Sequence, residues 1–112
     1  MAKYEQNLYG NFDEILKSLE TGIIRGSMSA SFENGSDYDN GSVRCAVRVF
    51  ERYSMMGGNR VSLNLTLIGS GDNSFLTAIT SGGSQAVLFK LNTFGEEAFL
   101  EGVIDIVKGY CR

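Results

Sequence analysis

Histidine, proline and tryptophan are absent from the 112 residues, and only two cysteines occur. The absence of histidine removes the commonest general base and the commonest metal ligand. A zinc site needs about four ligands, and here it would need carboxylates beside Cys45 and Cys111, which lie far apart in the sequence. We therefore predict no metal, no cofactor and no enzymatic activity.

No strong charge of either sign is present, because 10 basic and 13 acidic residues give a net charge of −3. This balance creates no field that would attract a phosphate backbone, so we predict no nucleic-acid partner. No apolar run approaches the roughly 20 residues that span a bilayer, and no apolar run follows a basic start at the N-terminus. We predict no membrane span, no signal peptide, and two reduced thiols in a cytoplasmic protein.

The composition is that of a globular chain, with 43% apolar and 21% charged residues. Chains form separate cores only at about twice this length. The sequence therefore predicts a single domain over residues 1–112.

Helical periodicity occurs near both ends of the chain. Asn11 stands three residues before Glu14, a spacing typical of a helix cap. Apolar residues then recur at helical spacing, namely Phe12, Ile15, Leu16, Leu19 and Ile23. Thr93 and Glu96 repeat the capping pattern, and the closing helix is expected to run to about Tyr110.

Between these helices the sequence alternates as strands do. We predict strands over 3–9, 27–32, 43–53, 60–68, 74–80 and 85–91, with turns at 34–41, 69–73 and 81–84. The predicted fold class is α+β, an antiparallel β-meander of about five to six strands. An N-terminal amphipathic helix and a long C-terminal helix pack on the sheet, in the order β-α-β-β-β-β-β-α.

Register connects these strands to a predicted interface. Pairing Val49 with Leu63 makes one face continuously apolar, as a half-buried sheet requires. The second face then carries a further apolar band, which a second subunit, a ligand or a helix would cover. Its predicted interface residues are Phe50, Ile68, Leu76, Val87 and Phe89. We expect a homodimer formed through this band or through the C-terminal helix.

Arginines recur at even spacing along the strand 43–53. Arg44, Arg48 and Arg52 share one face of it, and Arg60 is near in the predicted hairpin. Arginine forks bind phosphate or carboxylate groups in a bidentate manner, but they also pair with carboxylates of a helix or subunit, or stay solvated. The alternative functional prediction is a carrier or sensor of a small apolar or amphipathic ligand, whose acidic head group these four arginines would receive.

Three further patterns do not match the functional motifs that they resemble. The run Gly69–Ser74 begins like a dinucleotide fingerprint but lacks the third glycine and joins two strands. The run Asp37–Gly41 has its glycine at the fifth position and not at the sixth, and it lacks the closing glutamate of a calcium loop. The serines have no histidine to activate them.

Four runs carry a resemblance that extends over nearly the whole chain, GNFDEIL at 10–16, GNRVSL at 58–63, GDNSFLTAITSGGSQ at 71–85 and TFGEEAFL at 93–100. They resemble a family of short, uncharacterised cytosolic bacterial proteins classed as a domain of unknown function, which implies no activity. The meander followed by a long helix is also similar to the helix-grip (START-like) fold. That similarity implies an apolar ligand cavity between sheet and helix, although this chain is shorter than most members.

Overall fold

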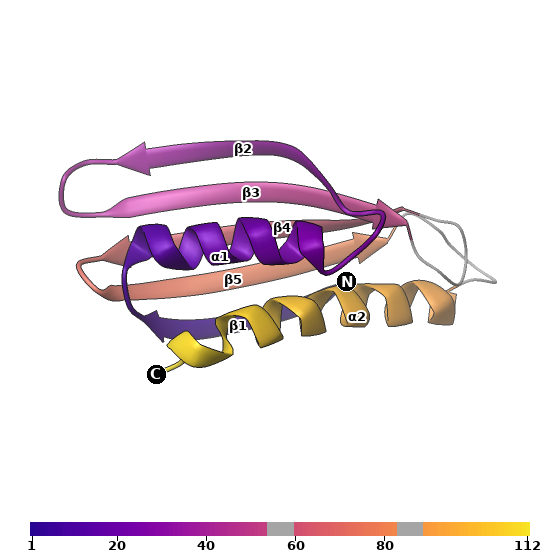
Figure 1. The fold of residues 1–112 in the computed structure, drawn as a ribbon. Coiled ribbons are helices and arrows are strands. Elements are labelled where there is room, and N and C mark those ends of the chain that lie inside the picture. The colour runs from indigo at the N-terminus through magenta and orange to yellow at the C-terminus, as the bar shows by residue number, and fades with distance from the viewer. Residues whose placement is uncertain (54–59, 83–88) are drawn as a thin grey trace.

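The structure is a computed structural model that describes residues 1–53, 60–82 and 89–112, and the side chains of these residues except 89–94. The chain forms one α+β unit (Figure 1). Its elements are β1 (Ala2–Tyr9), α1 (Phe12–Arg25), β2 (Ser31–Asp39), β3 (Arg44–Tyr53), β4 (Arg60–Ser70), β5 (Asn73–Gly82), α2 (Phe89–Val107) and a short 3₁₀ turn (Lys108–Tyr110). The predicted α+β class, with one early helix and one C-terminal helix, is confirmed.

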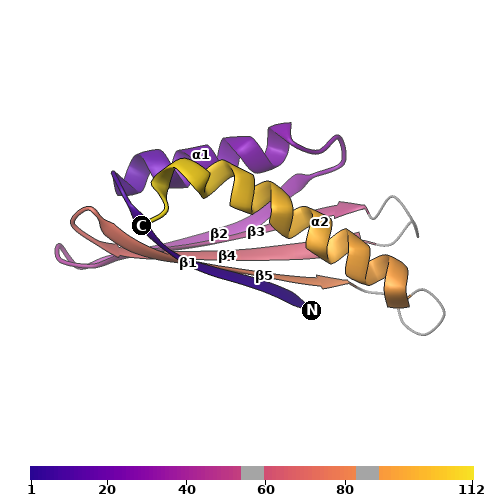
Figure 2. The ribbon, with the colours of Figure 1, turned by 90° about the horizontal axis from the view of Figure 1, so that it is seen from below.

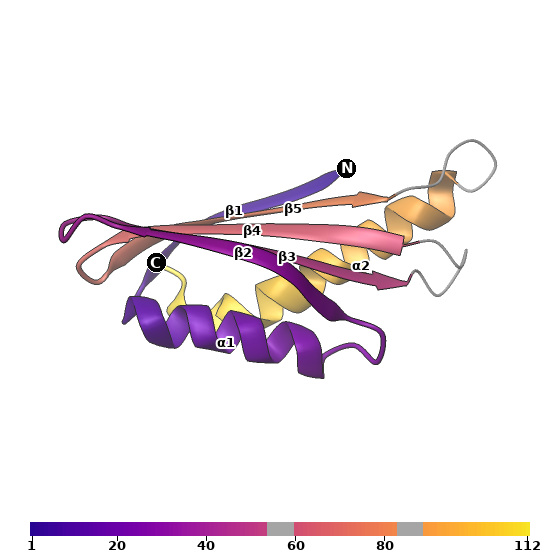
Figure 3. The same cartoon turned by 90° about the horizontal axis from the view of Figure 1, so that it is seen from above.

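The five strands form one antiparallel sheet in the order β1-β5-β4-β3-β2. Both helices lie against the same face of this sheet, as Figure 2 and Figure 3 show from opposite sides. We call this the covered face. The other side, which no described element of the chain overlies, is the open face.

Helix α1 begins where its sequence predicts. The Asn11 side-chain oxygen accepts a hydrogen bond from the Glu14 backbone N–H at 3.0 Å, which satisfies one of the free donors of the first turn. The apolar stripe that follows faces the sheet, and Ile15 and Leu19 are completely buried. Burial of this stripe, more than helix propensity, holds α1 in place.

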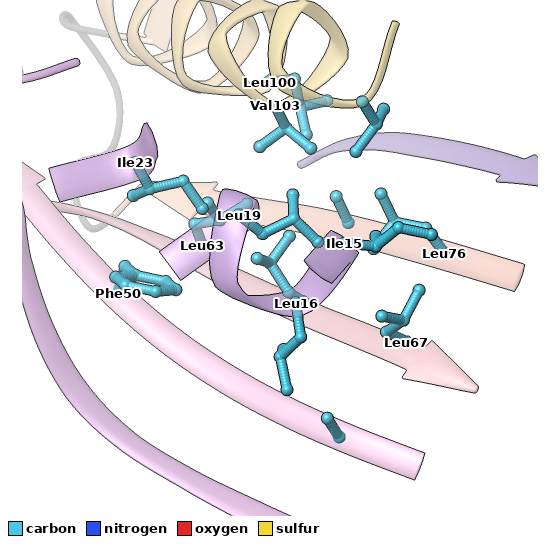
Figure 4. Close-up of a cluster of buried hydrophobic side chains, with 14 of the residues drawn as sticks. Ile15, Leu16, Leu19, Ile23, Phe50, Leu63, Leu67, Leu76, Leu100 and Val103 are labelled. Carbon is cyan, nitrogen blue, oxygen red and sulfur yellow. The ribbon is translucent and has the colours of Figure 1, made fainter. Parts of the chain in front are cut away.

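The core lies between the helices and the covered face (Figure 4). Helix α1 contributes Ile15, Leu16, Leu19 and Ile23, and α2 contributes Leu100 and Val103 from above. Strands β3, β4 and β5 supply the opposite wall, which includes Phe50, Leu63, Leu65, Leu67, Leu76 and Ala78.

The predicted register of the β3–β4 hairpin is wrong by one residue. Leu63 pairs with Phe50, and Val49 pairs with Asn64. A shift of one residue exchanges the two faces of a strand. As a result, the face of β3 that carries Arg44, Arg48 and Arg52 is the covered face, beside the leucines of β4.

The predicted turn over 34–41 is also wrong in its extent. Strand β2 continues through Asp39 and pairs with β3, after a bulge between Phe32 and Asn34. The turn itself lies at Asn40–Val43, where the Asn40 side chain accepts hydrogen bonds from the backbone N–H groups of Ser42 and Val43. Strand β2 lies at the edge of the sheet and pairs with β3 alone, and polar and charged residues are common on such edge strands.

The sixth predicted strand, 85–91, is not part of the sheet where the chain is described. Residues 85–88 lie outside the described residues, and 89–91 form the first turn of α2. Of the predicted turn at 81–84, Ser81 and Gly82 belong to β5, and the other two residues lie outside the described part. Strand β5 pairs with β1 instead, with Ile79 beside Lys3.

Candidate functional site

Three of the four arginines predicted to bind a ligand stand on the covered face of β3. We call Arg44, Arg48 and Arg52 the arginine ladder. They lie four residues apart, so their side chains project from the same side of the strand. Arg60, the fourth, lies on the opposite face of its hairpin, because it pairs with Tyr53 and alternates with the buried Val61.

Arg44 forms the first rung of the ladder. Its Nη1 lies 2.8 Å from Asp13 Oδ1 of α1, and its Nε lies 3.7 Å from Asp39 Oδ2 of β2. The guanidinium also stands 4.3 Å from the centre of the Phe12 ring, within range of a cation–π contact. Arg44 therefore connects a helix, a sheet edge and an aromatic ring of the core.

Arg48 repeats this arrangement one rung further along and is more deeply buried. Its Nε donates to Glu20 Oε2 at 2.7 Å and its Nη2 to Asp37 Oδ1 at 2.9 Å. Its Nη1 donates to the backbone carbonyls of Ser36 and Val47. Burial by itself lowers the pKa of Arg48, but the hydrogen bonds to Glu20 and Asp37 outweigh it and raise this pKa above its ordinary value.

Arg52, the third rung, has a different environment. Its Nη2 donates to the Gly95 carbonyl of α2 at 3.4 Å, and its guanidinium stands 4.4 Å from the centre of the Phe99 ring. No carboxylate among the described residues lies within 4.0 Å of it. Burial lowers the pKa of Arg52, because the cation loses hydration.

Arg60 lies apart from the ladder and is half exposed. Its Nη2 lies 2.6 Å from Glu51 Oε1 and 3.7 Å from Glu33 Oε2, and the guanidinium stands 5.6 Å from the centre of the Tyr53 ring. The structure therefore brings together three of the four predicted arginines, and carboxylates of the chain itself pair with Arg44, Arg48 and Arg60.

The open face carries a row of uncharged, largely apolar side chains that crosses four strands. Tyr38 of β2 pairs with Cys45 of β3, Cys45 with Ile68 of β4, and Ile68 with Phe75 of β5. We call these four residues the transverse row. Tyr38 is 61% exposed and Ile68 is 42% exposed.

The predicted interface residues divide between the two faces. Ile68 lies on the open face, as an interface there requires. Phe50 and Leu76 are 1% and 0% exposed and belong to the core beneath the helices, so their inclusion in the interface is corrected. The one-residue register error placed Phe50 on the wrong face. Val87 and the side chain of Phe89 lie outside the described residues.

Sequence reasoning did not find the other members of the transverse row. Tyr38 lay in the predicted turn, and Cys45 lay on the face of its strand that the sequence assigned to the core. A usable signal was present, because the side of β3 opposite the arginines reads Cys45, Val47 and Val49 without a charge.

Neither a cluster of metal ligands nor a membrane-spanning helix is found where the chain is described. No group of three or more cysteine, aspartate or glutamate side chains is placed to hold a metal ion in that part of the chain. Within the same residues, none of the helices has both the length and the apolar character that crossing a bilayer demands.

Comparison with known proteins identifies the family of the chain. No curated protein and no solved structure matches the chain, so the resemblance to the helix-grip fold stays a prediction. One family model matches over residues 1–111, which is almost the full length, and it describes a family of unknown function. The chain therefore belongs to that family, DUF6054.

Proposed function

We propose that this chain is a small non-enzymatic protein that self-associates as a homodimer through the open face of its sheet. The observation that carries the proposal is the transverse row, four uncharged residues in direct register across four strands. The next row, Val47, Thr66 and Thr77, is without charge on β3, β4 and β5 and ends at Glu5 on the edge strand β1. Monomeric proteins seldom leave a continuous apolar surface of this kind in water.

A second copy of the chain is the occupant that this surface fits best. In a twofold dimer a patch meets its own copy, so a charged patch would bring like charges together. Around the transverse row the open face is largely neutral, and its charged residues lie toward the margins, Lys3 and Glu5 on β1, and Glu51 and Arg60 toward the other end. Neutral centre and charged margin are the usual anatomy of an interface.

The area of the open face is also sufficient. Five strands about 4.8 Å apart, each about ten residues long at about 3.3 Å per residue, cover about 800 Å². A stable interface of standard size buries about 800 Å² on each partner. The face does not need to be enlarged by other elements to hold a dimer together.

The C-terminal helix is the less favourable interface of the two that the sequence predicted. Its apolar residues Phe99, Leu100, Val103 and Val107 are already buried against the sheet and α1. Its exposed residues include Glu97, Glu101, Asp105 and Lys108. A partner on that side would have to remove charges from water without gaining apolar contact.

The proposal assigns no catalytic chemistry, since the chain has no histidine. It assigns the cytoplasm as the compartment, because Cys45 and Cys111 are both free thiols, as is typical of a reducing environment.

The test replaces Ile68 with lysine and compares oligomeric state by native mass spectrometry and sedimentation. We expect the unmodified chain to be a dimer and Ile68→Lys to be a folded monomer, because two added charges would face each other at the interface. Ile24→Lys is the matched control, since Ile24 is 41% exposed on α1, on the other side of the sheet. A monomeric unmodified chain, or an Ile68→Lys variant that remains dimeric, would contradict the proposal.

A further inference from the structure

The arginine ladder and helix α1 run in step with each other. Asp13 pairs with Arg44, and Glu20, seven residues later, pairs with Arg48. Seven residues of helix rise about 10.5 Å and four residues of strand about 13 Å, so the two spacings differ by about 3 Å per repeat. Seven residues beyond Glu20 the chain has Ser27, which follows the end of α1 at Arg25 and lines the same crevice as Arg52. The third rung thus has its arginine but a serine in place of the carboxylate.

The chain offers Arg52 no other carboxylate. None of the ion pairs in the described residues includes it. Residues 54–59 and 83–94 contain no aspartate or glutamate, so none of them can supply the missing group. Arg44, Arg48 and Arg60 each have two carboxylates within 4.0 Å, and Arg52 differs from all three.

A crevice of about 30 Å³ opens beside Arg52, between the end of α1 and the middle of α2. Gly22, Gly26 and Gly102 contribute no side chains to its wall, and Ile23, Phe99 and Ile106 make the remainder apolar. The crevice has room for a small polar group, since one water molecule needs about 10–15 Å³ of cavity volume. A half-buried cation beside such a space, with apolar surface around it, is suited to an anionic head group on an apolar body.

We propose that Arg52 binds the carboxylate of a small monocarboxylic acid, whose apolar tail contacts Phe99 and Ile106 at the crevice. The bound carboxylate pairs with Arg52. Asp13 and Glu20 pair in the same way with the other two arginines of the ladder. Among the residues of the crevice wall Arg52 is the one cation, and the C-terminal end of α1 beside it carries partial negative charge. A singly charged anion fits this setting better than a phosphate, which is more highly charged.

Two further observations agree with this assignment. The Phe99 ring that Arg52 contacts leaves the edge of the guanidinium available, and among the described residues the hydrogen bond that Nη2 donates is a long one of 3.4 Å. The pKa of Arg52 is lowered by burial, and an adjacent carboxylate would restore it. The site lies on the covered side of the sheet, so it is independent of dimerisation through the open face.

The test titrates the full chain with hexanoate and with hexanamide, the neutral compound of the same shape, while backbone amide signals are followed by NMR. We expect hexanoate to shift the amides of Gly26 and Gly102 in a saturable way and to bind at least about tenfold more tightly than hexanamide, since hydrogen bonds to a charged partner are the stronger ones. Arg52→Gln should remove this preference. Arg60→Gln, which removes the same charge from an exposed position, should keep it.

A second variant keeps the test decisive if Arg52→Gln fails to fold. Ser27→Glu places a carboxylate of the chain itself at the third rung, and we expect it to fold and to lose hexanoate binding. The proposal would be overturned by hexanamide binding as well as hexanoate, by undiminished binding to Ser27→Glu, by no saturable shift at these glycines, or by inorganic phosphate binding there more tightly than hexanoate.

Discussion

Two arginine side chains of β3 connect the edge strand β2 to helix α1. Neither of the two described helices covers β2, and every residue of that strand after Ser31 is exposed. Asp37 and Asp39 of β2 pair instead with Arg48 and Arg44, which also hold Glu20 and Asp13 of α1. A pattern that in sequence is equally compatible with a solvated face or a ligand site thus joins the edge of the sheet to the helix.

Substitution of the buried Arg48 should therefore lower the free energy of unfolding more than substitution of an exposed arginine. For Arg48→Met we expect a loss of about 1–3 kcal/mol in the free energy of unfolding, because four hydrogen bonds disappear and two backbone carbonyls lose a donor. Its partners Glu20 and Asp37 are partly exposed, so water compensates some of the loss. Urea denaturation of the two proteins measures the difference.

Arg60→Met is the control for this prediction, because Arg60 is half exposed and its ion pairs contribute about 1 kcal/mol or less. Equal and small losses in the two variants would show that the ladder does not hold β2 to the rest of the fold.

At the scale of elements, the two helices meet where one of them has no side chain. A Cβ built on Gly22 of α1 would lie 2.7 Å from Cδ1 and 2.8 Å from Cγ1 of Ile106 on α2. The helices can therefore approach only because residue 22 is glycine. Gly102 of α2 has no heavy atom within 4 Å of such a Cβ among the described residues, which makes it a matched position without this constraint.

Gly22→Ala and Gly102→Ala should change stability in opposite directions. Alanine in place of a helical glycine gains up to about 1 kcal/mol in helix propensity, which Gly102→Ala should realise. At Gly22 overpacking against Ile106 costs typically about 1–3 kcal/mol, so we expect a net loss. Thermal denaturation of both variants measures the signs.

The Ile106→Ala background isolates the contact. There Gly22→Ala should become stabilising, since the atoms it would meet are gone. If Gly22→Ala is equally destabilising with and without Ile106, the close approach of the helices is not the cause.

Most elements of this fold can be predicted from local sequence, because their signals are local. The Asn11 cap and the apolar stripe define α1 without reference to anything distant, and alternation marks β3, β4 and most of β5. The candidate arginines on β3 share a face by the same alternation. Which face of β3 is covered cannot be found in this way, because Cys45, Val47 and Val49 look more apolar than the arginine side. Arg44 and Arg48 can lie beneath a helix only because Asp13, Glu20, Asp37 and Asp39 meet them there, and that requires the tertiary structure.

At the scale of the whole molecule, the described elements form two layers that leave the sheet with one uncovered face and two edges. The edges have features that oppose strand addition, a bulge and three carboxylates on β2 and alternating charges at Lys3 and Glu5 on β1. The open face has no comparable protection along the transverse row. Association of copies is therefore expected face to face and not edge to edge, which gives a closed dimer and not an extending fibre.

The alkylation rates of the two cysteines can report face-to-face association. Cys45 belongs to the transverse row and is partly buried, whereas Cys111 is exposed near the C-terminus. In a dimer the partner's open face would cover Cys45, so the rate of its alkylation should fall as protein concentration rises through the dissociation constant. The rate at Cys111 should not change, and peptide mass spectrometry separates the two sites. Ile68→Lys should make Cys45 react at the dilute rate at every concentration. If the alkylation rates of Cys45 and Cys111 fall together, or if neither rate depends on protein concentration, the copies do not meet through this face.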